Sequence, residues 1–307
     1  MIPVGAGDKM DGAVTEMLPR NNWFMAGNRE IRCSRPLVMG IVNVTPDSFY
    51  DGGRYNLPEQ AVARALELVE QGADILDIGA ESTRPGAYPV SQEDELARLI
   101  PVINNLACRV TVPISVDTTK AAVAQSALDA GACIVNDVSA LRRDMAMASV
   151  VARSGAAVIL MHMQGTPQTM QDAPQYDDVV EEVVSFLQER MHAAEAAGIS
   201  KTHIILDPGI GFGKLLKHNL EILNRLSDLT KLQCPVLVGA SRKAFIGQLL
   251  DRSVEHRQWG TAAAVALAVD RGAAILRVHD VAMMADVVKV AAAMRANMPQ
   301  VGQEHNA

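Results

Sequence analysis

Cysteine is scarce in this chain, and the cysteines that occur lie far apart. They are Cys33, Cys108, Cys133 and Cys234, without C-x-x-C spacing and without clustered histidines. This scatter argues against a structural zinc site and against a disulfide framework of the kind that small secreted domains use. A reducing compartment fits, and we expect a cytoplasmic protein.

Long apolar runs and an excess of basic residues are also missing. No stretch approaches the roughly 20 apolar residues that cross a bilayer, and Asp8, Asp11 and Glu16 stand where a secretion signal would be basic and then apolar. We therefore expect no membrane association. The formal net charge of -7 repels nucleic acid in general, so an anionic ligand would need a local concentration of Arg, Lys and backbone N–H groups.

The chain is rich in aliphatic residues, and these occur in a repeating order. Hydrophobic residues make up 49% of the 307 residues and charged residues 21%, which is enough for a large core. From Pro36 onward, short aliphatic runs alternate with longer amphipathic segments, and eight such pairs follow one another. The expected strands cover residues 37–44, 73–78, 113–117, 133–137, 157–162, 203–207, 236–239 and 274–278.

The longer segments predict helices between these strands, and several are followed by a glycine that can end a helix. The expected helices include residues 58–71, 93–107, 119–130, 177–197 and 258–271. Strand followed by helix, repeated, implies parallel strands, and eight units of roughly 30 residues close naturally into one barrel. We therefore predict an α/β protein with a single (β/α)8 TIM barrel at residues 35–298. An open doubly wound sheet is the alternative, although no G-x-G-x-x-G follows the first strand.

The two ends of the chain fall outside this repeat. Residues 1–34 carry Gly, Asp and Asn without sustained periodicity, and we expect a loosely ordered extension with a short strand near Trp23 and Phe24. Residues 299–307 are expected to be a C-terminal tail.

Polar residues stand at the end of nearly every expected strand. In parallel barrels the C-terminal strand ends meet at one rim, so these side chains are expected to form one site. Any one of them serves a loop or a helix start about as often as a function, but the whole set favours a site. The set comprises Asn43, Asp77, Asp117, Asn136, His162, Asp207, Ser241 to Lys243, Arg277 and His279.

The carboxylates and amides of this set suit a flat heterocycle. A carboxylate accepts two adjacent hydrogen bonds, and Asn both donates and accepts, so Asp117, Asn136 and Asp207 fit a 2-amino-4-oxo pyrimidine edge. A metal cluster is the alternative for such acidic residues. Lys243 and Arg277 stand among them, and nearby cations disfavour a tightly held polyvalent metal.

The basic residues of the rim indicate an anionic second half of the site. Arg84, Arg242, Lys243 and the pair Arg277 and His279 can bind diphosphate and a carboxylate. Ser241 precedes a helical start, so backbone N–H groups near Lys243 and Ala244 add to anion binding. The glycine-rich segment 209–214 lacks the spacing of a phosphate loop; its glycines are expected to let the backbone pass close under a flat ring, with Phe212 as a wall.

These motifs, in this order, resemble the dihydropteroate synthases. The resemblance covers Pro36 to about Met298 and is most specific in its first two motifs, M-G-I-V-N-V-T-P-D-S-F and D-I-G-A-E-S-T-R-P-G. It implies a barrel enzyme that joins 6-hydroxymethyl-7,8-dihydropterin diphosphate to p-aminobenzoate with loss of diphosphate. The motifs lie at residues 39–49, 77–86, 115–118, 136–137, 161–165, 207–209, 241–243 and 277–280.

The resemblance also implies roles for individual residues. Asp117, Lys243 and Arg277 are the implied catalytic residues, and Mg2+ at Asn43 is the implied cofactor. The implied pterin-binding residues are Asp77, Asp117, Asn136, Met161, Asp207, Phe212 and Lys243. Diphosphate binding is implied for Asn43, Arg277 and His279. The implied p-aminobenzoate-binding residues are Phe49, Thr83, Arg84, Pro85, Ser241, Lys243 and Ala244. A homodimer and competition by sulfonamides are implied as well.

Two departures and two alternatives accompany this resemblance. Ala244 stands where many members have Ser, and Ala80 where many have a second Gly, which leaves the affinity for p-aminobenzoate in question. A methyltetrahydrofolate:corrinoid methyltransferase shares the acidic pterin positions but has no use for a diphosphate site, against which the 81–86 loop and the pair Arg277 and His279 argue. A non-catalytic pterin-binding barrel would be expected to lose Arg277, Lys243 or the loop.

Overall fold

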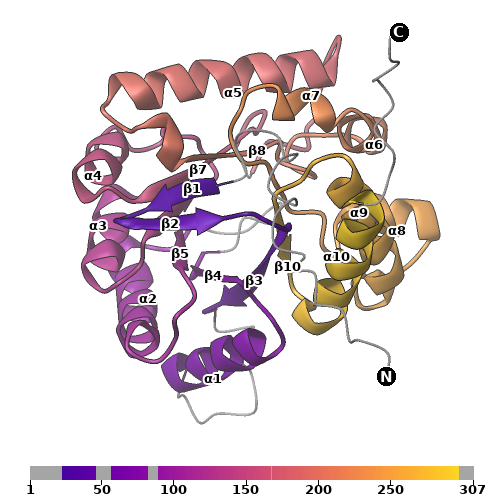
Figure 1. Cartoon of the computed structure of the whole chain (residues 1–307). Coiled ribbons are helices and arrows are strands. Elements are labelled where there is room, and N and C mark those ends of the chain that lie inside the picture. Colours follow the sequence, from indigo (N-terminus) through magenta and orange to yellow (C-terminus); the bar gives the residue numbers. More distant parts are fainter. Residues whose placement is uncertain (1–22, 46–56, 82–88, 167, 297–307) are drawn as a thin grey trace, which may run out of the picture.

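A sheet of eight parallel strands lies at the centre of the computed structural model, which describes residues 23–45, 57–81, 89–166 and 168–296 (Figure 1). The strands are β3 Leu37–Asn43, β4 Ile75–Gly79, β5 Ile114–Asp117, β6 Ile134–Asp137, β7 Ala157–Met161, β8 Ile204–Asp207, β9 Leu237–Val238 and β10 Ile275–Val278. Their spatial order is β8-β7-β6-β5-β4-β3-β10-β9, and a parallel bridge between Leu206 and Val236 joins the two outer strands. The sheet therefore closes, and the predicted (β/α)8 barrel is confirmed against the open sheet.

Helices follow the strands and cover the outside of the barrel (Figure 1). They are α1 Leu57–Glu70, α2 Gln92–Ala107, α3 Ala121–Asp129, α4 Met147–Ser154, α5 Val179–Ala196, α6 Leu216–Asn224, α7 Ser227–Thr230, α8 Ala244–Leu250, α9 Gln258–Asp270 and α10 Val281–Ala296, with 3-10 turns η2 Lys201–His203 and η3 Val254–His256. Local capping explains where some of them begin. The Ser91 hydroxyl accepts from the Asp94 N–H at 3.0 Å at the start of α2, as N-cap side chains do.

Strand residues alternate between two apolar layers. In β3, Val38 packs outward against the helices, whereas the next residue, Met39, lies in the barrel interior. This alternation follows from the period of two of a strand. The interior layer also contains Ile75, Ile134, Ile159, Ile205, Leu237 and Ile275.

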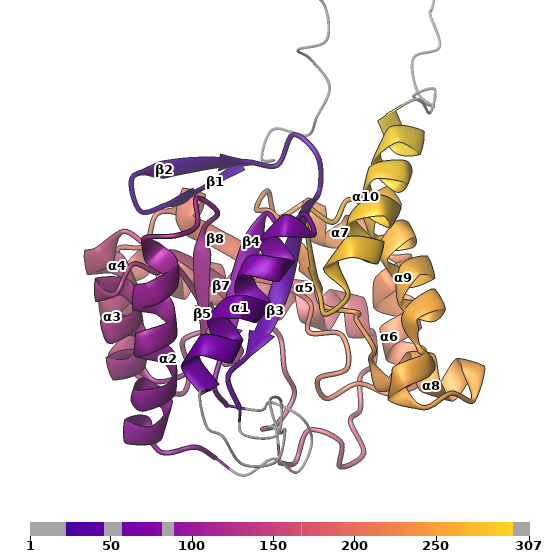
Figure 2. The same cartoon turned by 90° about the horizontal axis from the view of Figure 1, so that it is seen from below.

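A β-hairpin closes the N-terminal end of the barrel. Strands β1 Trp23–Ala26 and β2 Arg29–Arg32 pair antiparallel and lie across this end (Figure 2). Phe24 and Ile31 pack against the interior apolar layer, and the Gly27 N–H donates to the carbonyl oxygen of Gly155 at 3.0 Å. The strand expected near Trp23 and Phe24 is β1, and its partner strand had not been predicted. Because this end is plugged, a ligand can enter the described barrel interior only from the C-terminal strand ends.

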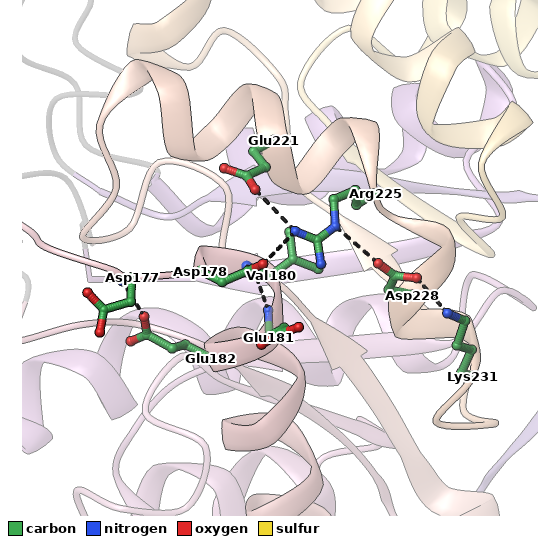
Figure 3. Close-up of polar contacts among 9 residues, drawn as sticks. All are labelled: Asp177, Asp178, Val180, Glu181, Glu182, Glu221, Arg225, Asp228 and Lys231. Atoms are coloured by element: carbon green, nitrogen blue, oxygen red, sulfur yellow. Dashed lines mark hydrogen bonds and ion pairs between the residues drawn. The ribbon is translucent and has the colours of Figure 1, made fainter.

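An ion-pair network outside the barrel joins α5, α6 and α7 (Figure 3). The Arg225 guanidinium, just after α6, donates to Asp178 at 2.8 Å, to Glu221 at 3.1 Å and to Asp228 at 3.2 Å. Asp178 also caps α5 by accepting from the backbone N–H of Val180 at 2.9 Å, and the hydrogen bond from Arg225 lowers the pKa of that carboxyl. The network fixes the helices that follow β7 and β8 relative to each other.

Candidate functional site

The barrel interior changes from apolar to polar two residues further along several strands. Because side chains two apart in a strand share a face, the polar residue lies above the apolar one in the same interior. The pairs are Ile75 and Asp77 in β4, Ile134 and Asn136 in β6, Ile205 and Asp207 in β8, and Ile275 and Arg277 in β10. A buried polar layer thus lies at the C-terminal end, where the sequence placed the site.

Arg277 connects two carboxylates in this layer. Its Nε donates to Asp77 Oδ2 at 2.6 Å and its Nη2 to Asp117 Oδ2 at 2.8 Å. Asp77 also accepts from the Ser115 hydroxyl at 2.7 Å and from the Asn136 amide at 3.1 Å. Asp77 is therefore surrounded by protein donors, and it orients Arg277 and Asn136 toward the remaining interior.

Burial is the main cause of the shifted pKa values of the Asp117 and Asp207 carboxyl groups. Asp117 is 9% and Asp207 6% exposed. Desolvation raises the pKa of Asp117 even though the positive charge of Arg277 lowers it, and nearby Asp77 raises it further. Desolvation likewise raises the pKa of Asp207, opposed by the Gly209 N–H bond at 2.7 Å and by Lys243. Both carboxyls take up a proton more readily than exposed ones do.

Lys243 and Phe212 form one wall of the site. The Lys243 ammonium lies 4.0 Å from the centroid of the Phe212 ring, which is a cation-π contact. Burial, and then the charge of Arg277, lower the pKa of Lys243 below its ordinary value. Phe212 packs against an apolar cluster that contains Met161, which is also an implied pterin-binding residue, together with Val138, Met163 and Met170.

The glycines of the segment 209–214 are required by close backbone contacts. Gly209 has φ +67°, and a Cβ there would lie 1.9 Å from the carbonyl oxygen of His162. At Gly213, with φ +60°, a Cβ would lie 2.6 Å from the carbonyl oxygen of Gln164. The backbone of this segment therefore lies in close contact with the loop after β7. This contact places Phe212, which stands between the two glycines, in the site.

His279 and Ser241 are linked at the same rim. The Ser241 hydroxyl oxygen accepts from the His279 backbone N–H at 3.2 Å and lies 3.0 Å from Nδ1 of its ring. Burial, and then the charge of Arg277, lower the pKa of His279 to about 4, so the ring is neutral at neutral pH. The donor in the Ser241–Nδ1 hydrogen bond depends on the ring tautomer: when Ser241 donates, the ring proton is on Nε2.

Arg242 differs from its neighbours in the Ser-Arg-Lys motif. Its guanidinium donates twice to Asp280, at 2.9 and 2.5 Å, and its backbone has φ +57°. The sequence counted Arg242 among the cations for an anionic ligand, but the structure pairs it with Asp280 instead. Lys243, the next residue, is the member of this motif whose ammonium group lies in the site.

The remaining predicted residues divide into two groups. Asn43 ends β3, paired with Gly79 in the sheet, and Ala244 is the exposed first residue of α8, next to Lys243. Phe49, Thr83, Arg84 and Pro85 lie outside the described residues.

Asn43 is the residue that the family resemblance implies as a metal ligand. Among the described residues, no group of three or more His, Cys, Asp or Glu side chains is arranged to hold one. Asp77 and Asp117 are bound by Arg277, and the ligand that the family resemblance implies is Asn43, at the end of β3. One amide oxygen fits a magnesium ion that is held mainly by phosphate oxygens and water, as Mg2+ often is.

A lysine bridge beside the site was not predicted. Lys120 lies just before α3, and its ammonium group donates at 2.5 Å to each of two carboxylates. These are Glu81, just after β4, and Glu95 in α2. Glu95 is fully buried. The bridge anchors the chain where it leaves β4. Nothing in the sequence marks these residues, because each belongs to an ordinary polar helix start or loop.

Comparisons with known proteins agree with this geometry. A family described as pterin binding enzyme matches residues 39–279. The dihydropteroate synthase of Escherichia coli strain K12 is 48% identical over 267 residues, which are 87% of this chain and 94% of that protein.

Two solved structures are similar as well. The Xanthomonas albilineans dihydropteroate synthase with 4-aminobenzoic acid has a TM-score of 0.85 and 50% identity, covering 91% of this chain and 100% of that one. The Yersinia pestis dihydropteroate synthase with a sulfonamide drug complex has a TM-score of 0.85 and 44% identity, covering 89% and 99%.

Proposed function

The chain belongs to the dihydropteroate synthases among the pterin binding enzymes, and from that premise we propose that it condenses 6-hydroxymethyl-7,8-dihydropterin diphosphate with p-aminobenzoate. The products are 7,8-dihydropteroate and diphosphate. The observation that carries the proposal is the buried polar layer, in which Asp117, Asp207 and Asn136 lie beside the cations Lys243 and Arg277.

The pterin ring is proposed to bind against the carboxylates and the apolar wall. Asp207, Asn136 and Asp117 offer buried acceptors and an amide for the adjacent N–H groups of the ring. Phe212 and Met161 give a flat apolar surface. Asp77 contributes by orienting Asn136 through the 3.1 Å hydrogen bond between them.

Substitution takes place at the methylene carbon beside the ring. The bond from carbon to the diphosphate oxygen breaks, the bond from carbon to the amine nitrogen forms, and the amine loses a proton. If the diphosphate leaves first, positive charge develops on the pterin methylene, and the ionised Asp117 stabilises it. Arg277 and the neutral Nε2–H of His279 stabilise the charge that grows on the departing diphosphate; one such preorganised donor contributes about 3 kcal/mol.

Mg2+ is proposed as the cofactor, held by Asn43 and by the oxygens of the diphosphate. When bound, it supplies positive charge that neutralises the leaving group. Chelation with EDTA should abolish diphosphate release, and added Mg2+ should restore it. Asn43→Ala should raise the Mg2+ concentration needed for half-maximal rate. An Asn43→Ala variant with the wild-type Mg2+ requirement would contradict this ligand.

p-Aminobenzoate is proposed to bind at the start of α8. Ser241 is already engaged by His279, so the carboxylate depends more on the Ala244 N–H, Lys243 and the predicted Arg84. The Yersinia relative binds a sulfonamide drug, and we propose that sulfonamides compete with p-aminobenzoate here.

Amine-dependent diphosphate release tests the activity directly. Purified protein is mixed with the pterin methyl diphosphate and Mg2+, with and without p-aminobenzoate. Release that requires the amine, with formation of dihydropteroate, is the expected result. Binding of the pterin without turnover would instead favour the non-catalytic barrel, and methyl transfer from methyltetrahydrofolate would favour the corrinoid methyltransferase.

A homodimer is proposed to form through the outer surface of α9 and α10. Trp259 is 77%, Val290 62% and Met294 65% exposed, and α9 carries no charged residue before its last position, Asp270. Exposed apolar side chains on two helices that pack against each other are typical of an interface. Sedimentation velocity should give a dimer for the wild type and a monomer for Trp259→Glu. The control variant Met145→Glu changes an exposed apolar residue just before α4 and should stay dimeric. A monomeric wild type would overturn the proposal.

We also propose a cytoplasmic location. No described helix is long and apolar enough to span a membrane. Burial raises the pKa of Cys33 to about 12 and of Cys234 to about 11, so these thiols stay protonated and unreactive in a reducing environment. Cell fractionation would test this location.

A further inference from the structure

Lys214 is a buried lysine that the reaction proposed above does not use. It lies between β8 and α6 and is 3% exposed. Its Nζ is 2.9 Å from Nδ1 of His162, and it donates to the carbonyl oxygen of Phe212 at 2.9 Å and to that of His162 at 3.4 Å. Within the described part of the chain no carboxylate forms an ion pair with it. A buried ammonium is costly unless it is fully hydrogen-bonded, so its partners indicate a specific task.

These partners belong to two separate segments. His162 follows β7, and Phe212 is in the glycine segment after β8. The same two segments touch at Gly209, where a Cβ would meet the His162 carbonyl oxygen at 1.9 Å. Lys214 thus donates hydrogen bonds to the backbone carbonyl oxygens of both segments at the point where they are in close contact.

His162 is held as a neutral acceptor in this arrangement. Burial, and then the charge of Lys214, lower the pKa of His162 to about 2. Its ring is also packed edge-on against Phe186, with centroids 4.9 Å apart. The ring cannot turn away without losing both contacts, so it provides Lys214 with a fixed anchor on the β7 side.

Lys214 affects the proposed pterin site through Phe212. Lys214 holds the carbonyl group of Phe212, and the ring of Phe212 lies under the Lys243 ammonium at 4.0 Å. Gly211 is also close to Lys243, since a Cβ there would lie 3.1 Å from Lys243 Cδ. A shift of the glycine segment therefore moves both the apolar wall and the cation beside Asp207.

We propose that Lys214 is a positioning residue for the pterin pocket, which clamps the Phe212 segment to His162 and thereby fixes the Phe212 ring and the Lys243 ammonium. This role rests on the proposed function, because it assigns Phe212 and Lys243 to the pterin. It is distinct from a general contribution to folding, since Phe212 is assigned to the pterin alone and the effect should therefore be larger for the pterin than for p-aminobenzoate.

Lys214→Met tests the clamp. Methionine keeps most of the side-chain volume and removes every hydrogen bond of Nζ. We expect the KM for the pterin diphosphate to rise about tenfold, which corresponds to ~1.4 kcal/mol, and the KM for p-aminobenzoate, to which only Lys243 of the two fixed groups is assigned, to rise by much less. Tyr176→Phe is the matched control: its hydroxyl donates to the Gly213 carbonyl oxygen at 2.7 Å, so the variant loses a bond to the same segment without touching Phe212. It should lower the melting temperature and leave both KM values unchanged.

A double-mutant cycle separates positioning from packing. If Lys214 acts through Phe212, Lys214→Met should add little to the loss of pterin affinity in a Phe212→Leu background. Titration of 6-hydroxymethylpterin by calorimetry gives this affinity without turnover. Additive losses, or equal effects on both substrates, would overturn the proposal. Should Lys214→Met fail to fold, Lys214→Gln, which keeps an N–H donor for the Phe212 carbonyl, must bind pterin more tightly than Lys214→Ala. Absence of amine-dependent turnover in the wild type would instead refute the proposed function.

Discussion

The Arg277 guanidinium donates to the Asp117 carboxylate at 2.8 Å, although the two residues are 160 positions apart in the chain. β10 carries Arg277 and β5 carries Asp117, and β3 and β4 lie between these strands in the sheet. The contact therefore crosses the barrel interior. It joins the residue proposed to hold the leaving diphosphate to the residue proposed to stabilise the pterin cation, so neither charge is set independently of the other.

Arg277→Lys should slow turnover although the charge is kept. Lysine has no planar fork and cannot donate to Asp77 and Asp117 with the geometry of Nε and Nη2. We expect kcat/KM to fall about a hundredfold, close to 3 kcal/mol of transition-state stabilisation. Steady-state diphosphate release measures this. Wild-type kinetics in the variant would remove Arg277 from the proposed catalytic residues.

Asp207→Ala should weaken pterin binding by roughly 2 to 3 kcal/mol, because a buried ring N–H loses a charged acceptor. Part of the loss has a structural origin, since Asp207 also accepts from the Gly209 N–H at 2.7 Å. Asp207→Asn is the suitable comparison, because its amide oxygen keeps an acceptor for Gly209. Calorimetric titration with a pterin that shows equal affinity for wild type and Asp207→Ala would refute the assignment.

The pH dependence of kcat/KM should reflect the protonation of the buried carboxyl groups. Burial raises the pKa of Asp117, so this group binds a proton at a pH where an exposed aspartate, with a pKa of about 3.9, is already ionised. Because the reaction needs the carboxylate, kcat/KM should fall as the pH decreases through this raised pKa. Burial raises the pKa of Asp207 as well, so the fall of kcat/KM at acidic pH reflects the protonation of both carboxyl groups. A profile that stays flat down to pH values near an ordinary aspartate pKa would contradict this prediction.

Ala244→Ser should tighten the binding of p-aminobenzoate. The first residue of α8 is exposed and follows Lys243 directly, so a hydroxyl there can donate to the carboxylate. A single added hydrogen bond to a charged group is worth about 1.5 to 3 kcal/mol. The KM for p-aminobenzoate should therefore decrease about tenfold or more, with the KM for the pterin diphosphate unchanged. An unchanged KM for p-aminobenzoate would place its carboxylate away from this helix start.

The order of elements was determined by the sequence alone. Aliphatic runs and amphipathic segments alternate because each strand of a closed parallel barrel is covered by its own helix, and every expected strand is present with bounds within two residues. The polar layer could also be predicted, since Asp77, Asn136, Asp207 and Arg277 each follow an aliphatic interior residue at the spacing of two that a strand imposes. These are local patterns, and local patterns can be read along a chain.

The pairing of these side chains was decided only by the tertiary structure. That Arg277 bonds Asp77 and Asp117, whereas Arg242 bonds Asp280, depends on which strand ends meet and on the direction of each side chain. Lys214 and Lys120 resemble ordinary surface lysines in the sequence, and only their neighbours make them buried bridges. Burial depends on the whole packed barrel, and burial is what raises the pKa of Asp117 and lowers that of His279.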